Sequence, residues 1–382
     1  MAPHDFTEQM LPPWRRAVLK VGSSLLAANG GGLSTEYAGA IAGFVVAAHR
    51  MGREVVVVSS GAVAAGRAIM REQPHDGAEM AERQALAALG QARLIGFWQA
   101  LLDRQVAQVL LTHDDLRNRR RYLNARATLS ALLRHRAVPV VNENDTVSVD
   151  ELKLGDNDNL AAIVAALIDA DVLFIATDID GLYDANPRGN PDARLVPEVL
   201  ELGPEVLAMA GGSGSAVGTG GMRTKLEAAA KAGAAGIDTV LFNGRRPEVV
   251  RELVHDRLHG TRIRASRSRI AARKYWLRHA PLERGARIVV DAGAAGALAG
   301  KGASLLPGGV VAAEGEFRRG DMVEVVVRGQ AGDSAIARGI SQYSAVDVGR
   351  IAGRHSRDIE SILGYNYGGN VIHRDDLVLL GS

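Results

Sequence analysis

The chain has 382 residues, of which 47% are hydrophobic and 23% are charged, the composition of an ordinary globular protein. It contains no cysteine, which excludes disulfides, cysteine-ligated zinc, iron–sulfur clusters and a cysteine nucleophile. The formal net charge of +2 is too small to indicate nucleic-acid binding by itself. No apolar run reaches the roughly 18–20 residues of a membrane span, and residues 1–14 lack the apolar core of a secretory signal. We therefore expect a cytoplasmic protein without membrane contact.

After an N-terminal extension (1–14) that we expect to be disordered, strand-like and helix-like segments alternate. Short apolar runs predict strands at 17–21, 54–59, 106–111, 138–141, 172–176 and 239–242. Helical spacing predicts helices at 34–50, with Ser34 as N-cap, then at 80–104, 118–134, 157–168 and from 222 onward. This alternation indicates an α/β fold with a mostly parallel sheet.

The C-terminal part has a different texture. Arginines and a lysine crowd residues 262–278, which we interpret as a basic linker. From about residue 283 the predicted strands are short and separated by Gly and Pro, which is typical of a small β-barrel or sandwich. The predicted organisation is an extension (1–14), an α/β domain (15–260), a linker (261–282) and a β domain (283–382).

Common nucleotide and metal motifs are missing from the sequence. No segment fits the P-loop pattern G-x-x-x-x-G-K-[ST], the dinucleotide fingerprint G-x-G-x-x-G or the zinc-protease pattern H-E-x-x-H. A P-loop NTPase, a dehydrogenase with the glycine fingerprint and a zincin are therefore disfavoured.

Two loops after predicted strands carry groups suited to an anion. Lys20 lies on a buried strand, where an ammonium needs an anionic partner, and the following Gly22–Ser24 turn offers backbone N–H groups. Residues 59–67 (SSGAVAAGR) combine small side chains with the start of a helix. A lysine that reaches solvent at a strand end and an ordinary glycine turn explain the same residues, so neither loop is decisive alone.

The most unusual cluster combines Asn142–Asp145, after a predicted strand, with Gly155–Asn159, which opens a helix. Helix capping explains one or two of these residues. So many acidic and amide groups beside strand ends favour a ligand site. Their repulsion would be relieved by Mg²⁺, a lysine or a substrate ammonium, and the amides could hold a carboxylate.

Two further loops are candidates for nucleotide binding. Thr177 and Asp178 follow another strand, and residues 181–187 are either a nucleotide loop or a turn rich in Gly, Asp, Asn and Pro. Residues 218–225 (GTGGMRTK) place a glycine-rich loop, a helix N-terminus and Lys225 together, which suits phosphate unless the loop is merely flexible. Phosphoryl transfer needs this kind of charge neutralisation and positioning.

Six segments resemble those of the glutamate 5-kinase family, whose members are amino-acid kinases with a C-terminal PUA domain. These segments are Val18–Ser24, Ser59–Arg67, Val141–Val147, Lys153–Ala162, Thr177–Arg188 and Gly218–Lys225. The first and last segments are shared with other amino-acid kinases. The combination of Asn142–Asp145 (NEND), Gly155–Asn159 (GDNDN) and a PUA-like tail is more specific to this family. The resemblance covers about Arg16 to Leu377 and implies a three-layer α/β/α sandwich with a mostly parallel sheet, followed by a small PUA-like β-barrel.

The resemblance implies phosphorylation of the γ-carboxylate of L-glutamate by ATP with Mg²⁺, giving γ-glutamyl phosphate, the first step of proline biosynthesis. It places Lys20 and Lys225 on the transferring phosphates, with Asp158 organising both lysines. It assigns glutamate to Ser60, Asp145 and Asn157, and assigns no side chain to a metal. The residues it assigns to ATP are Lys20, Thr177, Asp178, Thr219, Gly220, Gly221, Met222, Arg223, Thr224 and Lys225.

The resemblance also implies inhibition by proline, a homo-oligomer (dimer or tetramer) and hand-off of the product to glutamate-5-semialdehyde dehydrogenase. Two alternatives stay open. One is another amino-acid kinase, acting on acetylglutamate, aspartate or a nucleoside monophosphate, against which the GDNDN segment and the PUA-like tail argue. The other is an RNA-binding protein that acts through the PUA-like domain and the basic linker, against which the phosphate-binding groups before residue 230 argue.

Overall fold

The computed structural model describes residues 8–27, 32–70, 80–148, 157–187, 189–210, 221–266, 277, 282, 285–329 and 332–380. The chain divides into two compact units, Met1–Arg269 and Ile270–Ser382. Strand β10 (Gly260–Ile263) belongs to the sheet of the first unit, so that unit continues past the boundary at residue 260 that the sequence predicts. Residues 267–276 and 278–281 of the predicted basic linker (261–282) lie outside the described residues.

An eight-stranded sheet forms the centre of the first unit, with strand order β4-β5-β3-β2-β6-β8-β10-β7. Neighbouring strands are parallel except for β8 and β10, which are antiparallel. The strands are β2 (Arg16–Val21), β3 (Glu54–Ser59), β4 (Val106–Leu111), β5 (Val138–Glu143), β6 (Val172–Thr177), β7 (Glu198–Val199), β8 (Asp238–Asn243) and β10. The parallel strands end at one edge of the sheet, where ligands bind in open α/β folds.

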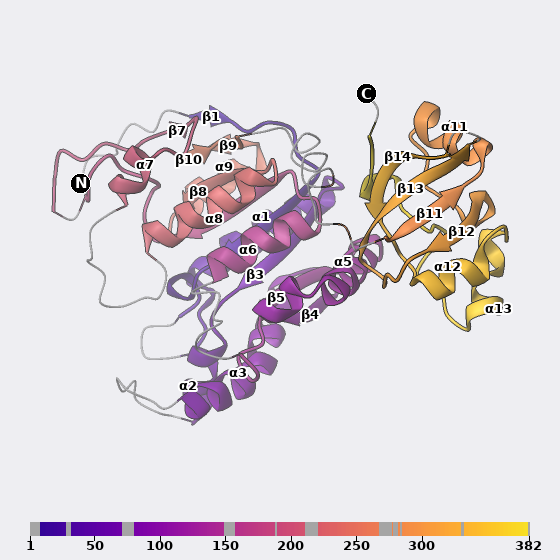
Figure 1. Cartoon of the computed structure of the whole chain (residues 1–382). Helices are drawn as coiled ribbons and strands as arrows, with labels where there is room; N and C mark the ends of the chain where they lie inside the picture. The colour runs from indigo at the N-terminus through magenta and orange to yellow at the C-terminus, as the bar shows by residue number, and fades with distance from the viewer. Residues whose placement is uncertain are drawn as a thin grey trace. The chain divides into compact units, whose positions relative to one another are not determined.

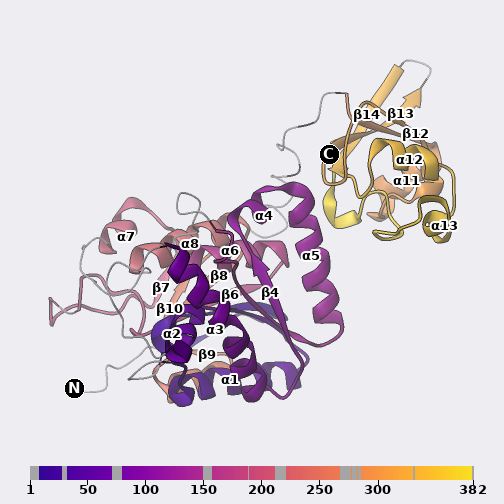
Figure 2. The same cartoon turned by 90° about the horizontal axis from the view of Figure 1, so that it is seen from below.

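Helices cover both faces of this sheet, so the predicted three-layer α/β/α sandwich is confirmed (Figure 1). The core on one face takes residues from α1 (Thr35–Arg50), α3 (Met80–Leu101) and α9 (Pro247–Val254). The core on the other face takes residues from α5 (Arg119–Arg134), α6 (Asn157–Leu167) and α8 (Met222–Ala234). The described residues of this unit also form α2 (Ala62–Met70), α4 (His113–Arg117) and α7 (Pro204–Met209), which Figure 2 shows from below.

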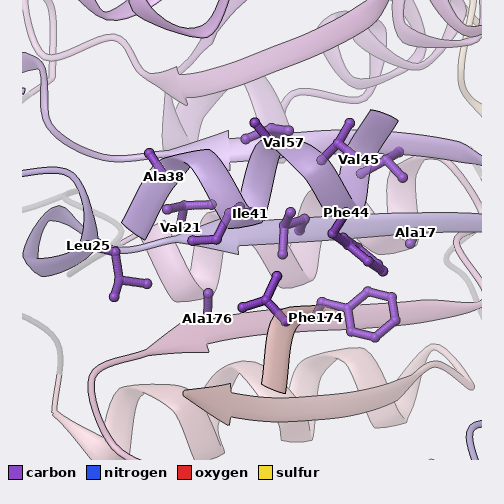
Figure 3. Packing of buried hydrophobic residues seen from close by; sticks show 14 of the residues in the cluster. Ala17, Val21, Leu25, Ala38, Ile41, Phe44, Val45, Val57, Phe174 and Ala176 are labelled. Carbon is purple, nitrogen blue, oxygen red and sulfur yellow. The ribbon is translucent and has the colours of Figure 1, made fainter. Parts of the chain in front are cut away.

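Alternation along β2 decides which side chains enter which layer. Leu19 and Val21 belong to the core beside α1, whereas Val18 belongs to the core beside α6. Figure 3 shows the first of these cores, where Phe44 of α1 lies against Phe174 of β6, with ring centroids 5.4 Å apart. Since successive strand residues point to opposite faces, Lys20 points to the same face as Val18, toward α6.

Residues 9–14, which the sequence assigns to a disordered extension, are ordered. Strand β1 (Gln9–Met10) pairs antiparallel with β9 (Arg257–Leu258). Trp14 is 6% exposed, and its indole N–H donates to the Asp256 carboxylate at 2.9 Å. Arg53 donates two hydrogen bonds to the same carboxylate and stacks over the Trp14 ring. A partner more than 240 positions away leaves no local pattern in the sequence, which is why composition alone missed this strand.

The second unit contains a five-stranded sheet of order β12-β11-β13-β14-β15. Its strands are β11 (Arg287–Val290), β12 (Val310–Glu314), β13 (Met322–Gly329), β14 (Gly332–Ile340) and β15 (Leu377–Leu379). The unit also contains α11 (Ala292–Lys301), α12 (Ala345–Ile351) and α13 (Ile359–Leu363), which the sequence did not predict. These helices and the sheet share a core of their own, centred on Tyr343 and Ile288.

Candidate active site

Three buried charged side chains meet at the edge of the sheet where the parallel strands end. Lys20 of β2 and Lys225 of α8 are 5% and 6% exposed, and Asp158 of α6 is fully buried. The Lys20 ammonium lies 2.5 Å from Asp158 Oδ1, and the Lys225 ammonium lies 3.1 Å from Asp158 Oδ2. Buried charges persist when they are paired. Together the three groups carry a net charge of +1, which favours an anion beside them.

Two helix N-termini add to this positive field. Asp158 is the second residue of α6, and α8 begins directly after Gly221, its N-cap. The Thr224 hydroxyl lies 3.0 Å from Asp158 Oδ2 and 2.9 Å from the Gly221 carbonyl oxygen, which ties the start of α8 to α6. Unpaired backbone N–H groups at a helix start attract phosphate or carboxylate, so this edge of the sheet suits a highly anionic ligand.

A second group lies next to the first, built on Asn157. The Asn157 amide nitrogen donates to Ser60 Oγ at 2.8 Å and to Asn142 Oδ1 at 2.9 Å. Both amide hydrogens are thereby used, which leaves the Asn157 carbonyl as an acceptor and the Ser60 hydroxyl as a donor. An acceptor beside a donor suits a zwitterionic amino acid. Asn142, 5% exposed, was inside the predicted acidic–amide cluster but was not itself predicted as a site residue.

The Ser60 backbone is held in place through Trp98, which the sequence analysis did not predict as a site residue. The Trp98 indole N–H donates to Ser59 Oγ at 2.9 Å, and the Ser59 hydroxyl donates to the Ser60 carbonyl oxygen at 3.0 Å. The next residue, Gly61, has φ +110°, a conformation open to glycine and costly for other residues. The two bonds and this glycine set the turn from β3 into α2.

The loop after β6 is braced through Asp180. Its carboxylate accepts from the Asn243 amide at 2.8 Å and from the Tyr183 hydroxyl at 3.1 Å, and pairs with Arg246 at 3.3 Å. Burial and then the Asp180 charge raise the pKa of Tyr183 to about 12, so its hydroxyl stays a donor at neutral pH. These contacts order the segment that begins with Thr177 and Asp178. None of these bracing residues was predicted as a site residue.

The remaining described site predictions lie in the loop after β6, at the start of α8 and in the loop after β5. The Thr177 hydroxyl donates to its neighbour Asp178 at 3.4 Å. Exposed Arg223 pairs with Glu227 at 3.1 Å, and Met222 is the first residue of α8. Asp145 lines a cavity together with residues of α3 and β4. Thr219 and Gly220 lie outside the described residues.

Acidic and imidazole side chains of the described residues do not gather into a metal centre. Among them, no group of three or more His, Cys, Asp or Glu side chains could hold a metal ion. The Asp158 carboxylate, the most buried acid at the site, has a lysine on each of its oxygens. The donor set therefore fits the phosphates of a nucleotide. Within the described part of the chain, no helix has the length and apolar character to cross a membrane.

Comparisons with known proteins identify the family of the chain. Residues 15–243 match the Amino acid kinase family, and residues 286–363 match the PUA domain. The chain is 74% identical to the glutamate 5-kinase of Xanthomonas euvesicatoria over 95% of its length and 100% of that protein. The chain belongs to the glutamate 5-kinase family. The glutamate 5-kinase of Xylella fastidiosa strain M12 is 69% identical, over 99% of this chain and 98% of that protein. The predicted family, the kinase activity class and the PUA-containing architecture are thus confirmed.

Proposed function

We propose that this chain transfers the γ-phosphoryl group of ATP to the γ-carboxylate of L-glutamate, giving γ-glutamyl phosphate and ADP. One observation carries the proposal: Asp158 is buried between Lys20 and Lys225 at the sheet edge. The chain matches the two glutamate 5-kinases named above over nearly their whole length. This match supports glutamate over other acceptors.

The chemical problem is to bring a carboxylate up to a triphosphate, because both are anions. Two fixed ammonium groups lower this repulsion and stabilise the charge on the transferring group. Asp158 is a positioning residue: it holds both ammonium groups in place before the substrates arrive. Mg²⁺ bound to the ATP phosphates supplies further charge neutralisation when present.

The two substrates are proposed to approach this centre from different sides. Ser60, Asp145 and Asn157 hold glutamate. Ser60 and Asn157 do so through the donor and acceptor that their mutual hydrogen bond leaves available. Thr177, Asp178 and the start of α8, where Gly221 and Lys225 lie, hold ATP. The Asp180 contacts keep the first of these nucleotide segments in place.

The direct test uses hydroxylamine, which traps an acyl phosphate as a coloured hydroxamate. The full chain with ATP, Mg²⁺ and L-glutamate should form hydroxamate, while aspartate, N-acetylglutamate and nucleoside monophosphates as acceptors should give much less. A preference for any of these acceptors over glutamate would replace the proposal with another amino-acid kinase activity.

We further propose that free proline inhibits the enzyme. Proline carries an α-carboxylate and a cationic nitrogen, so the groups that hold glutamate can hold it as well. Inhibition should be competitive, and raising the glutamate concentration should relieve it. Activity unchanged at millimolar proline would remove this part of the proposal while leaving the kinase reaction intact.

The family resemblance supports two more proposals about assembly. We expect a dimer or tetramer in solution, which sedimentation analysis would measure. We also expect the reactive acyl phosphate to be consumed by glutamate-5-semialdehyde dehydrogenase, a step this cysteine-free chain cannot perform with a cysteine nucleophile. A monomer at micromolar concentration would contradict the first.

A further inference from the structure

Ser60 stands where several elements of the first unit meet. Its backbone N–H donates to the Val21 carbonyl oxygen at 3.1 Å, and Val21 follows Lys20 at the end of β2. Its hydroxyl oxygen accepts from the Asn157 amide at the start of α6, at 2.8 Å. Its carbonyl oxygen accepts from the Ser59 hydroxyl at 3.0 Å. These three bonds leave the hydroxyl hydrogen of Ser60 for a ligand.

The direction of the Ser59 hydroxyl depends on Trp98 of α3. Both residues are 0% exposed, and the Trp98 indole N–H donates to Ser59 Oγ at 2.9 Å. An indole N–H can only donate, so the Ser59 oxygen accepts this bond and its single proton is left for the Ser60 carbonyl. The two bonds therefore run in one direction, from α3 to the Ser60 backbone, and hydrogen bonds in such a chain strengthen one another.

Hydrophobic packing alone does not require this arrangement. Trp98 belongs to the core beside α1, together with Leu94 and Leu102, and an aromatic ring without the N–H would be buried there as well. A buried indole N–H costs free energy unless it finds a partner. Here the partner is the side chain one residue before Ser60, so the bond has a consequence at the active site as well as in the core.

The Ser60 carbonyl belongs to the peptide group that precedes Gly61. Gly61, with φ +110°, turns the chain from β3 into α2. Because the peptide group is planar, holding its carbonyl fixes the rotation of the whole plane, and with it ψ of Ser60 and φ of Gly61. Without the Trp98 bond, the Ser59 hydroxyl is free to rotate away, and the Ser60 backbone is then held on its N–H side only.

We propose that Trp98 is a positioning residue for the transfer reaction. Through Ser59 it fixes the backbone of Ser60, so that the Ser60 hydroxyl meets the acceptor in one orientation relative to Lys20. Because Trp98 is fully buried, it acts without touching a substrate. The inference rests on the proposed function, in which Ser60 holds glutamate, and adds a residue behind the site that controls this contact.

The test removes single atoms of the chain of hydrogen bonds. Trp98→Phe removes the indole N–H and keeps a buried ring. It should raise the KM for glutamate about three- to tenfold, the scale for losing one neutral hydrogen bond, with the KM for ATP near the wild-type value. Ser59→Ala breaks the same chain at its middle atom and should give the same split between the two KM values. Hydroxamate formation by the full chain measures both.

The double variant separates one chain of bonds from two independent packing effects. When both substitutions act through the same bond to Ser60, the variant with Trp98→Phe and Ser59→Ala should raise the KM for glutamate no more than about twofold beyond either single variant. Effects of independent substitutions would instead multiply in KM, because their free energies add.

Trp14→Phe is the matched control. Trp14 is buried in the same core cluster, and its indole N–H also donates at 2.9 Å, but to the Asp256 carboxylate. This variant should unfold at a lower temperature and keep the wild-type KM for glutamate. Circular dichroism checks that each variant is folded.

A wild-type KM for glutamate in folded Trp98→Phe and Ser59→Ala would overturn the inference, and so would a double variant in which the two changes multiply. An equal rise in the KM for ATP and the KM for glutamate would mark a general structural defect and count against it too. A wild-type chain that forms no acyl phosphate would instead count against the proposed function. Calorimetric binding of glutamate would then decide the positioning role: weaker binding in Trp98→Phe but not in Trp14→Phe supports it, and equal binding in both overturns it.

Discussion

Lys20 and Lys225 reach one carboxylate from elements about 200 residues apart in the chain. We predict that Lys20→Ala or Lys225→Ala lowers kcat by about 10²–10³-fold, the scale for losing one preorganised charge-stabilising group. The measurement is hydroxamate formation at saturating substrates. Lys231→Ala is the matched control on α8, because Lys231 is exposed and its ammonium bonds to Asn159 instead of Asp158. The kcat of this variant should stay near the wild-type value. Near wild-type kcat in a folded Lys20 or Lys225 variant would refute the assignment.

The same residue-scale reasoning gives a pH dependence of stability at His49. Burial, and then the nearby Arg104 charge, lower the pKa of His49 from its ordinary value of 6.5. The unfolded chain therefore binds a proton more readily than the folded chain. The contribution of His49 to stability is therefore fully present above pH 6.5 and is lost as the pH falls below that value.

Replacing His49 with glutamine removes the titrating group and keeps a polar side chain. The difference in thermal midpoint between wild type and His49→Gln should shift in favour of the variant between pH 7.5 and pH 5.5. A difference independent of pH would show that His49 titrates alike in both states.

Much of the site could be predicted at the level of single residues, with clear limits. Lys20, Asp158 and Lys225 sit in segments whose composition is unusual for a strand end or helix start, so the sequence points to them. Trp98 carries no such signal: it occupies an ordinary apolar position of a helix, and its bond to Ser59 spans 39 residues. Contacts of this kind depend on how elements pack, which the sequence pattern does not show.

At the scale of elements, α2 and α3 pack with their backbones in close contact. A Cβ at Gly66 would lie 1.9 Å from the Leu86 carbonyl oxygen, and one at Gly90 would lie 1.8 Å from the Ala62 carbonyl oxygen. The two helix backbones therefore touch, and only glycine permits it. We predict that Gly66→Ala or Gly90→Ala lowers the free energy of unfolding by about 1–3 kcal/mol, because the helices must separate.

A glycine on the same helix supplies the control. Gly96 of α3 is exposed and a Cβ there meets nothing within 4 Å. Gly96→Ala should raise the free energy of unfolding by roughly 0.5–1 kcal/mol, since alanine is the better helix former. Thermal or denaturant unfolding measures both effects. Equal stabilisation by all three substitutions would mean that the helices do not approach this closely.

Element prediction succeeded where periodicity was strong and failed where it was weak. The helix over Thr35–Arg50, with Ser34 accepting from the Glu36 amide as its N-cap, matches the prediction. The Ala- and Gly-rich α11 and the short α12 and α13 were missed, because segments of such composition or length carry little helical periodicity. Strand β1 was missed because two residues cannot show alternation at all.

At the scale of the whole molecule, the described core residues form separate clusters. The two cores of the first unit draw on residues up to Ile263, and the core of the second unit draws on residues from Ala286 onward. Units with separate cores can fold independently. The full chain should therefore show two calorimetric unfolding transitions, of which one is lost when the chain is shortened.

The last prediction concerns where the chemistry resides. Every residue proposed to hold glutamate or ATP lies at or before Lys225, within the unit that ends at Arg269. A chain shortened to residues 1–269 keeps both cores and all of these residues, so it should still form glutamate-dependent hydroxamate. Its sensitivity to proline or its oligomer size can change, because the PUA domain (286–363) that the shortened chain lacks would serve as a regulatory or assembly element. A shortened chain that is folded by circular dichroism yet forms no acyl phosphate would show that the second unit contributes to the active site. If the shortened chain keeps the wild-type kcat and KM for glutamate, the whole reaction takes place in the first unit.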